Sequence, residues 1–280
     1  MSAKLLEGKP IAERIKEEIK KEIEALGRRP VLASVLVGDN AGAEAYVKSQ
    51  KKTAEALGIE YQYHKLGGDA SEESLGRFID KLNNDNGVGG IIIQMPLPAQ
   101  IDYKKISRLI SPVKDIEGMH PANIGKIIFG NAKILPPTAA SVMELLAASG
   151  IDLYGKEVVV VGHSEIVGKP LALLLLEKFA TVTVCHIGTS KAQKLEEHVK
   201  SAEILIVAVG RAALIKKDWV KPGAVVIDVG INRVDGKIVG DVEPEAAERA
   251  SIITPVPGGV GPLTVTLLMR NLVEAVKLQR

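Results

Sequence analysis

The chain has 280 residues and a mass of 29.8 kDa, which is enough for one large domain or two domains of ordinary size. Hydrophobic residues make up 46% of it and charged residues 25%, as is typical of soluble globular proteins. Its 36 basic and 34 acidic residues are interspersed and leave a net charge of +2, so we expect no nucleic-acid or membrane-surface partner, which would require a clustered basic stripe.

The single cysteine, Cys185, excludes an intrachain disulfide and favours a reducing compartment. The first 26 residues show an amphipathic, charged helix pattern without the apolar core of a signal peptide. The longest apolar runs are too short to cross a bilayer. We therefore expect a cytoplasmic protein.

Strands and helices alternate through the first half of the chain. Apolar and β-branched runs predict strands at Pro30–Val37, Glu60–Lys65 and Val88–Gln94. Helical periodicity follows the first strand, where it includes Tyr46, and recurs over Glu72–Asn84. This βαβ rhythm predicts a parallel sheet that is covered on both faces.

The same rhythm restarts after Pro136 and Pro137. The predicted strands and helices are Thr138–Ala148 (helix), Glu157–Val161 (strand), Pro170–Phe179 (helix), Thr181–Cys185 (strand), Leu195–Val199 (helix), and the strands Ile204–Ala208, Val225–Val229 and Ser251–Thr254. A closing helix from about residue 263 could belong to either half. We predict an α/β protein of two units, with a boundary between residues 118 and 140.

A glycine turn opens the second unit. Val158–Gly168 reads VVVVGHSEIVG, in which a strand ends at Gly162 and a helix begins shortly after Gly168. Free N–H groups at such a helix start can hold a pyrophosphate. The motif departs from G-x-G-x-x-G because Ser164 stands at the second glycine position.

The strand after this motif ends at Cys185-His186, without the carboxylate that would bind the ribose 2′-hydroxyl of NAD. Together with His163, His186 and Lys191, this absence favours NADP over NAD. The five histidines are scattered without metal-ligand spacing, so we expect no metal site. No G-x-S-x-G elbow supports a serine hydrolase.

Several further motifs are too specific for a generic α/β protein. They are YVKSQKK at 46–52, QMPLP at 94–98, KDIEG at 114–118, DVGIN at 228–232, GDV at 240–242 and TPVPGGVGPLTV at 254–265. In this order they resemble the methylenetetrahydrofolate dehydrogenase/cyclohydrolase family of the FolD type, and the resemblance runs nearly end to end.

The resemblance implies a fold and an activity. The family oxidises 5,10-methylenetetrahydrofolate to the 5,10-methenyl form with NADP⁺, and most members then hydrolyse the product to 10-formyltetrahydrofolate. Its fold is an N-terminal α/β catalytic domain plus a Rossmann-like NAD(P)-binding domain with a cleft between them, assembled as a homodimer. Carried over, the folate-binding catalytic domain would be residues 1–120, the NAD(P)-binding domain 121–262, and helix 263–280 would pack back on the first.

The resemblance also assigns roles to residues. Tyr46 would stack on the pterin, Glu117 would bind its amino-pyrimidine edge, and Gln94 would lie near the reacting centre, which with Gln50 makes the catalytic set. The expected substrate-binding residues are Tyr46, Val47, Gln94, Met95, Pro96, Asp115, Glu117, Pro257, Gly258 and Gly259. The expected cofactor-binding residues are Gly162, His163, Ser164, Ile166, Val167, Gly168, His186, Ile187, Ile231, Gly261 and Thr264.

The chain departs from the family pattern at Gln50. The family has a lysine there, four residues after the tyrosine and on the same helix face, and it assists the hydrolytic step. Glutamine cannot ionise, and Glu117 replaces a family aspartate in the same cleft, so dehydrogenase activity is expected while cyclohydrolase activity stays open. Lys48 or Lys51 could substitute only if the helix turned differently.

Other function classes also stay open. A shikimate-dehydrogenase-like enzyme or another two-domain NAD(P)-dependent oxidoreductase would share the fold but would not explain QMPLP or TPVPGGVGP. A non-catalytic cofactor-binding dimer is compatible with the changes at Gln50 and Glu117.

Overall fold

The computed structural model describes residues 3–280, which fold as two compact α/β units. One unit comprises Arg14–Pro137 and Val265–Arg280, and we call it the β2 unit after its central strand. The other comprises the residues up to Glu13 and Thr138–Thr264, and we call it the β5 unit. The predicted two-unit α/β class is confirmed.

The division between the units lies at 137/138. The residue pattern predicts a boundary between residues 118 and 140, and the family resemblance implies one at 120/121. The intervening segment is held by the β2 unit through hydrogen bonds. Asn123 Nδ2 donates to Asp115 Oδ2 over 3.0 Å, and Asn271 Nδ2 donates to the carbonyl of Leu135 over 2.7 Å.

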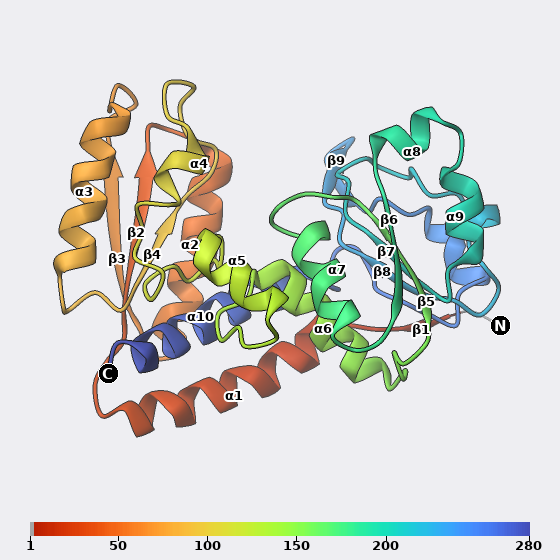
Figure 1. Ribbon diagram of the computed structural model, residues 1–280, viewed down its shortest axis with the longest axis horizontal. Coiled ribbons are helices and arrows are strands. Elements are labelled where there is room, and N and C mark those ends of the chain that lie inside the picture. The colour runs from red at the N-terminus through yellow and green to blue at the C-terminus, as the bar shows by residue number, and fades with distance from the viewer. Residues whose placement is uncertain (1–2) are drawn as a thin grey trace. The chain divides into compact units, whose positions relative to one another are not determined.

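The β2 unit is built on a parallel sheet, as predicted, and its strand order is β3-β2-β4 (Figure 1). Its strands are β2 (Val31–Val37), β3 (Glu60–Leu66) and β4 (Gly90–Ile93). Its helices are α2 (Ala41–Ala56), α3 (Glu72–Asn84), α4 (Tyr103–Ile106) and α5 (Pro121–Ile128), together with most of α1 (Gly8–Leu26) and α10 (Gly261–Leu278).

The two faces of this sheet carry different residues because side chains alternate along a strand. Ala33, Val35 and Val37 face one way and pack in a core with Leu75 and Ile79 of α3. The intervening residue Ser34 is fully buried on the other face and bonds to a side chain that also reaches α2. The α2 face of the sheet therefore contains a polar position within an apolar layer.

The side chain of Asn40 caps the start of helix α2. The Asn40 side chain accepts a hydrogen bond from the backbone N–H of Ala43, which satisfies one of the free donors of the first turn. Val47, Gln50 and Ala54 are buried along one face of the helix. The lysines Lys48 and Lys51 lie on its exposed side, which leaves Gln50 as the inward-facing residue of that turn.

The segment KDIEG is fixed by a buried lysine. Lys114 is only 5% exposed, and its Nζ donates to the carbonyls of Leu82, Asn83 and Asp85, over 3.0, 2.8 and 2.7 Å, at the carboxyl end of α3. The helix dipole also favours the positive charge of this lysine at the carboxyl end of the helix. This anchor sets the path of the chain toward Glu117.

The β5 unit is built on a parallel sheet with the order β1-β11-β8-β7-β5-β6. Its strands are β1 (Lys4–Leu5), β5 (Glu157–Val161), β6 (Thr181–Cys185), β7 (Ile204–Val207), β8 (Val225–Asp228) and β11 (Ile252–Ile253), beside a hairpin of β9 (Asn232–Val234) and β10 (Lys237–Val239). Its helices are α6 (Pro137–Ser149), α7 (Gly168–Leu176), α8 (Ile187–Lys191), α9 (Leu195–Ser201) and the short 3₁₀ turns η1 (Lys217–Trp219) and η2 (Pro244–Glu248).

The prediction of a helix over the first 26 residues was wrong for the residues that precede Gly8 in the described part of the chain. Lys4 and Leu5 form a strand because they pair in parallel with Ile252 and Ile253 at the end of the sheet. Helix α1 begins only at Gly8. Within residues 3–280, no helix is both long and apolar enough to cross a membrane.

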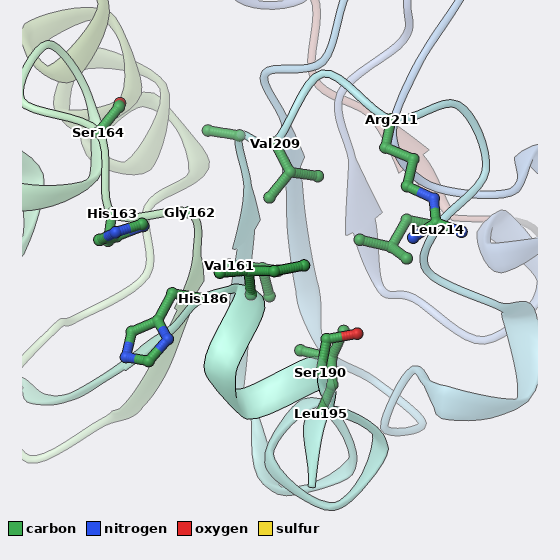
Figure 2. Close-up of a pocket in the computed structure, with 12 residues that line it drawn as sticks. Val161, Gly162, His163, Ser164, His186, Ser190, Leu195, Val209, Arg211 and Leu214 are labelled. Atoms are coloured by element: carbon green, nitrogen blue, oxygen red, sulfur yellow. The ribbon is translucent and has the colours of Figure 1, made fainter. Parts of the chain in front are cut away.

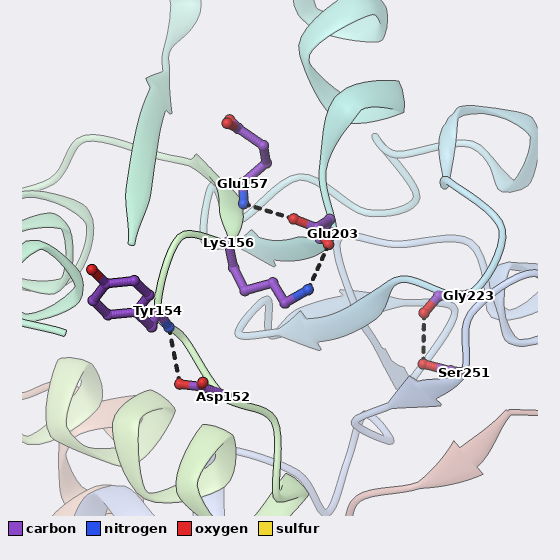
Figure 3. A network of polar contacts seen from close by, with 7 residues as sticks. All are labelled: Asp152, Tyr154, Lys156, Glu157, Glu203, Gly223 and Ser251. Atoms are coloured by element: carbon purple, nitrogen blue, oxygen red, sulfur yellow. Dashed lines mark hydrogen bonds and ion pairs between the residues drawn. The ribbon is translucent and has the colours of Figure 1, made fainter. Parts of the chain in front are cut away.

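The carboxylate of Glu203 links the beginnings of β5 and β7 at the amino-terminal edge of this sheet (Figure 3). Glu203, directly before β7, accepts from Lys156 Nζ over 2.8 Å and from the backbone N–H of Glu157 over 3.0 Å. These contacts align β5 with β7, so that their carboxyl ends emerge together at the opposite edge.

Candidate functional site

A cavity of about 420 Å³ lies in the β2 unit, at the carboxyl end of β4. The start of α2, the end of β4 and the residue Glu117 enclose it, and we call it the Tyr46 cavity. Its lining residues are Asn40, Gly42, Ala43, Tyr46, Ile92, Ile93, Gln94, Met95, Pro96 and Glu117. The cavity therefore contains five of the predicted site residues: Tyr46, Gln94, Met95, Pro96 and Glu117.

An aromatic ring and a carboxyl group share this cavity. Burial, followed by the negative charge of Glu117, raises the pKa of the Tyr46 hydroxyl to about 12, so the phenol is neutral at physiological pH. Desolvation and the neighbouring Asp115 raise the pKa of Glu117 to about 8, while a hydrogen bond with Tyr103 acts in the opposite direction. A ligand with paired N–H donors would stabilise the ionised carboxylate.

Gln94 follows directly after β4 and connects the cavity to buried groups beneath it. It is 3% exposed, and its Nε2 donates to Ser34 Oγ over 3.0 Å and to Gln50 Oε1 over 2.8 Å. The structure thus brings Gln50 and Gln94 together, although they lie 44 residues apart in the chain.

Other predicted substrate-binding residues lie elsewhere. Val47 is buried in α2 and does not line the Tyr46 cavity. Asp115 is 2% exposed, and its Oδ2 accepts from the backbone N–H of His120 and from Asn123 Nδ2, so it braces the chain before α5. The segment Pro257–Gly259 belongs to the β5 unit, where the carbonyl of Gly258 accepts from the N–H of Gly8.

A second cavity, of about 350 Å³, lies in the β5 unit at the carboxyl ends of β5, β6 and β7, and we call it the His163 cavity (Figure 2). Its lining residues are Val161, Gly162, His163, Ser164, His186, Ile187, Ser190, Leu195, Ala208, Val209, Arg211 and Leu214. Ligands bind at this edge in open parallel sheets.

Glycines make the turn at this cavity possible. Gly162 has a φ of +132°, and a Cβ there would lie 2.4 Å from the carbonyl oxygen of Ala208. A Cβ on Gly168 would lie 2.0 Å from the carbonyl oxygen of Gly162. The turn therefore packs tightly against the start of α7, whose free N–H groups suit an anionic group such as a pyrophosphate.

Nitrogen-bearing side chains lie on both sides of the His163 cavity (Figure 2). The rings of His163 and His186 are 5.2 Å apart, and Arg211 lies on the opposite side. His186 Nδ1 also accepts from the N–H of Gly188 and caps α8. Among residues 3–280, those that line this cavity include no carboxylate, so the site suits an additional phosphate better than a free 2′-hydroxyl.

The motifs DVGIN and GDV hold the loop that carries Arg211. Asp241 is fully buried and accepts from the backbone N–H groups of Val209, Gly210 and Arg211 over 2.7, 2.9 and 2.8 Å. Asp228 in turn accepts from the N–H groups of Asp241, Val242 and Gly230. Burial raises the pKa of Asp228 to about 6, although the hydrogen bonds from these backbone N–H groups act to lower it.

The remaining predicted cofactor residues do not line this cavity. Ile166 and Ile231 are exposed, whereas Val167 and Gly168 form the start of α7, and Gly261 and Thr264 lie at the start of α10. Their roles stay predictions.

Comparison with known proteins matches the two parts of the chain that contain these cavities to two family models. The model of the catalytic domain of tetrahydrofolate dehydrogenase/cyclohydrolase matches residues 6–117, and that of its NAD(P)-binding domain matches residues 136–280. The chain belongs to the tetrahydrofolate dehydrogenase/cyclohydrolase family. The match covers both units. Of the motifs that suggested it, QMPLP, DVGIN and TPVPGGVGPLTV lie at the carboxyl ends of β4, β8 and β11, and YVKSQKK lies within α2.

Individual relatives of the family are similar over their full length. The bifunctional protein FolD of Acetivibrio thermocellus is 52% identical over 100% of this chain and 99% of its own. The crystal structure of the bifunctional FolD of Campylobacter jejuni superimposes with a TM-score of 0.96, at 43% identity and full coverage of both chains. The Trypanosoma brucei FolD, solved with NADP and an inhibitor, gives a TM-score of 0.93 at 37% identity, covering 100% of this chain and 99% of its own.

Some residues at these sites were not singled out from the sequence. Tyr103 hydrogen-bonds to Glu117, Tyr61 hydrogen-bonds to Gln50, and Arg211 lines the His163 cavity. Tyr61 and Tyr103 lie outside the family motifs. The only sequence signal for them is the scarcity of tyrosine, of which the chain has five.

The raised pKa of Glu117 predicts a pH-dependent stability. Because its pKa is higher in the folded protein than in the unfolded chain, the stabilisation is present below the unfolded pKa of about 4.5 and is lost as pH rises through about 8. The difference in free energy of unfolding between the wild type and Glu117→Gln should therefore fall from about pH 5 to about pH 9 in urea titrations. Glu24→Gln, at an exposed position of α1, is the control. A difference that stays constant over this range for Glu117→Gln would contradict the raised pKa.

Proposed function

We propose that this protein oxidises 5,10-methylenetetrahydrofolate to 5,10-methenyltetrahydrofolate with NADP⁺. The observation that carries the proposal is the Tyr46 cavity, which combines an aromatic ring, the half-buried carboxyl of Glu117 and the amide of Gln94 at the end of a parallel strand. Membership of the tetrahydrofolate dehydrogenase/cyclohydrolase family supports the same reaction.

The chemistry of the folate matches the lining of this cavity. The flat pterin can stack on the ring of Tyr46, and its amino-pyrimidine edge presents N–H donors that the Glu117 carboxylate can accept. Removal of a hydride leaves a positive charge on the methenyl bridge. An oxygen of a fixed amide can stabilise that charge without ionising, and we assign this role to Gln94.

The His163 cavity is the proposed site of the cofactor. Gly162 allows close approach of a pyrophosphate to the start of α7, and His163, His186 and Arg211 offer nitrogen groups to a 2′-phosphate. NADP⁺, when bound, supplies the nicotinamide that accepts the hydride. In this proposal Arg14–Pro137 and the end of α10 bind folate, and the β5 unit binds the cofactor. The family resemblance also predicts a homodimer, and the composition with its single cysteine predicts a cytoplasmic protein.

The second family activity, hydrolysis of the methenyl bridge, requires a group that handles a proton. At the position of the family lysine this chain has Gln50, which is fully buried and accepts hydrogen bonds from neutral groups. Lys48 and Lys51 lie on the exposed side of α2. We therefore propose a dehydrogenase whose cyclohydrolase activity is weak.

The test of the dehydrogenase is the initial rate of reduced-cofactor formation with methylenetetrahydrofolate. We expect turnover, with kcat/KM for NADP⁺ at least about tenfold above that for NAD⁺, the scale of one charge-assisted hydrogen bond. Absence of turnover with either cofactor would favour a non-catalytic cofactor-binding dimer. A preference for NAD⁺ would contradict the proposed 2′-phosphate site.

The stacking role of Tyr46 predicts a selective loss of affinity. Tyr46→Ala should weaken folate binding by roughly tenfold or more, because the aromatic face is lost, and should leave NADP⁺ affinity nearly unchanged. Tyr46→Phe, which keeps the ring, is the matched control and should bind folate almost as well as the wild type. Isothermal titration of each ligand measures both affinities. Equal losses for folate and NADP⁺ would indicate a folding defect instead.

The substitution Gln50→Lys should raise the cyclohydrolase rate. A general acid–base group contributes about 10²-fold or more to such a step, so we expect a gain of that order over the weak wild-type rate. Gln50→Met, which cannot ionise, should show no gain. Adding Glu117→Asp tests whether the longer carboxylate also displaces the pterin. Robust hydrolysis by the unmodified protein would contradict this account of Gln50.

A further inference from the structure

Gln50 has a hydrogen-bond partner that the sequence did not indicate, which is Tyr61 on β3. Its hydroxyl donates to Gln50 Oε1 over 2.7 Å. Burial raises the pKa of this hydroxyl to about 12, so it carries its proton at physiological pH and can act as the donor. The contact joins β3 to the inward face of α2.

The oxygen of Gln50 is fully used by its neighbours. Gln50 is 0% exposed, and its Oε1 accepts from Gln94 Nε2 over 2.8 Å as well as from Tyr61. A carbonyl oxygen has two lone pairs, and both are occupied here. A lysine, which only donates hydrogen bonds, could not accept from either neighbour.

Gln94 is fixed by the same contacts. Of its two amide hydrogens, one is donated to Gln50 Oε1 and the other to Ser34 Oγ. Tyr61, Gln50, Gln94 and Ser34 thus form a continuous chain of hydrogen-bonded side chains, of which Gln50, Gln94 and Ser34 are buried and Tyr61 is half-buried. With both hydrogens committed, the group that Gln94 can offer to the Tyr46 cavity is its carbonyl oxygen.

We propose that Tyr61 is a positioning residue for this site: by donating to Gln50 it keeps Gln94 in the orientation that presents an oxygen, and no proton, to the bound ligand. The inference rests on the proposed dehydrogenase function. An oxygen at this position favours the positive charge that develops as hydride leaves the folate. It gives no assistance to hydrolysis, which needs a proton-handling group.

Steady-state dehydrogenase kinetics test this role. Tyr61→Phe should lower kcat by about tenfold, the scale of one hydrogen bond, with little change in the KM for folate, because stacking on Tyr46 is retained. Tyr63→Phe removes a hydroxyl from a half-exposed tyrosine two residues along the same strand and should leave kcat unchanged. An unchanged kcat in Tyr61→Phe, with an active wild type, would overturn the proposal.

A double-mutant cycle separates positioning from a general structural effect. In a Gln50→Met background the acceptor is already absent, so Tyr61→Phe should cause no further loss of kcat. Equal losses in both backgrounds would show that Tyr61 acts independently of Gln50 and would contradict the proposal.

A measurement without substrate keeps the inference distinct from the proposed function. In protein with ¹⁵N-labelled glutamine side chains, the amide hydrogens of Gln94 should exchange slowly with solvent, and Tyr61→Phe should accelerate the exchange while Tyr63→Phe should not. Unchanged exchange in Tyr61→Phe would overturn the positioning role. An inactive wild type with the predicted exchange pattern would instead contradict only the dehydrogenase proposal.

Discussion

A polar side chain that is buried at the end of a parallel strand must find its hydrogen-bond partners inside the protein, and Gln94 is such a side chain. Ser34 of β2 and Gln50 of α2 accept its two amide hydrogens, and Tyr61 of β3 completes the set. Among residues 3–280, Gln50 Nε2 is buried without a hydrogen-bond partner, so Gln50 is held through its oxygen alone. Removal of either donor to this oxygen would leave a further polar atom unsatisfied, and the hydrogen-bonded side chains therefore order one another. The position of α2 over the sheet, and with it the ring of Tyr46 one turn earlier, depends on this cluster.

The β5 unit uses buried carboxylates for a comparable purpose. Asp241 holds three consecutive N–H groups of the loop that leads to Arg211, and Asp228 holds the backbone of Asp241 itself. Glycine at 162 then lets the chain turn where a side chain would collide with Ala208. In both units, therefore, buried polar groups at the carboxyl ends of parallel strands position the loops that line a cavity. The acidic residues of DVGIN and GDV are accounted for by this support of the loop.

Local pattern was sufficient for most of the fold. The apolar runs at Val31–Val37 and Glu157–Val161 and the glycine turn after Val161 predict parallel α/β units, and Gln94 is visible as the polar end of a buried strand. Lys4 and Leu5 were misassigned because their strand exists only through pairing with β11, some 250 residues away. Tyr61 was missed for a related reason: its contact with Gln50 depends on the placement of β3 against α2, which no local periodicity encodes. Asp115 is 2% exposed, and its carboxylate accepts from internal donors of His120 and Asn123, a bracing role that the sequence did not indicate; its expected contact with substrate stays a prediction.

The account depends on a site that forms the methenyl cation and, as proposed, hydrolyses it only weakly. The most direct measurement is the product balance in a single reaction mixture, in which reduced cofactor and methenyltetrahydrofolate are quantified together while enzyme turns over methylenetetrahydrofolate and NADP⁺. We predict that the two products accumulate in nearly equal amounts, with enzyme-dependent hydrolysis much slower than NADPH formation. NADPH formation with 10-formyltetrahydrofolate as the main product, at a rate that depends on enzyme concentration, would contradict the account.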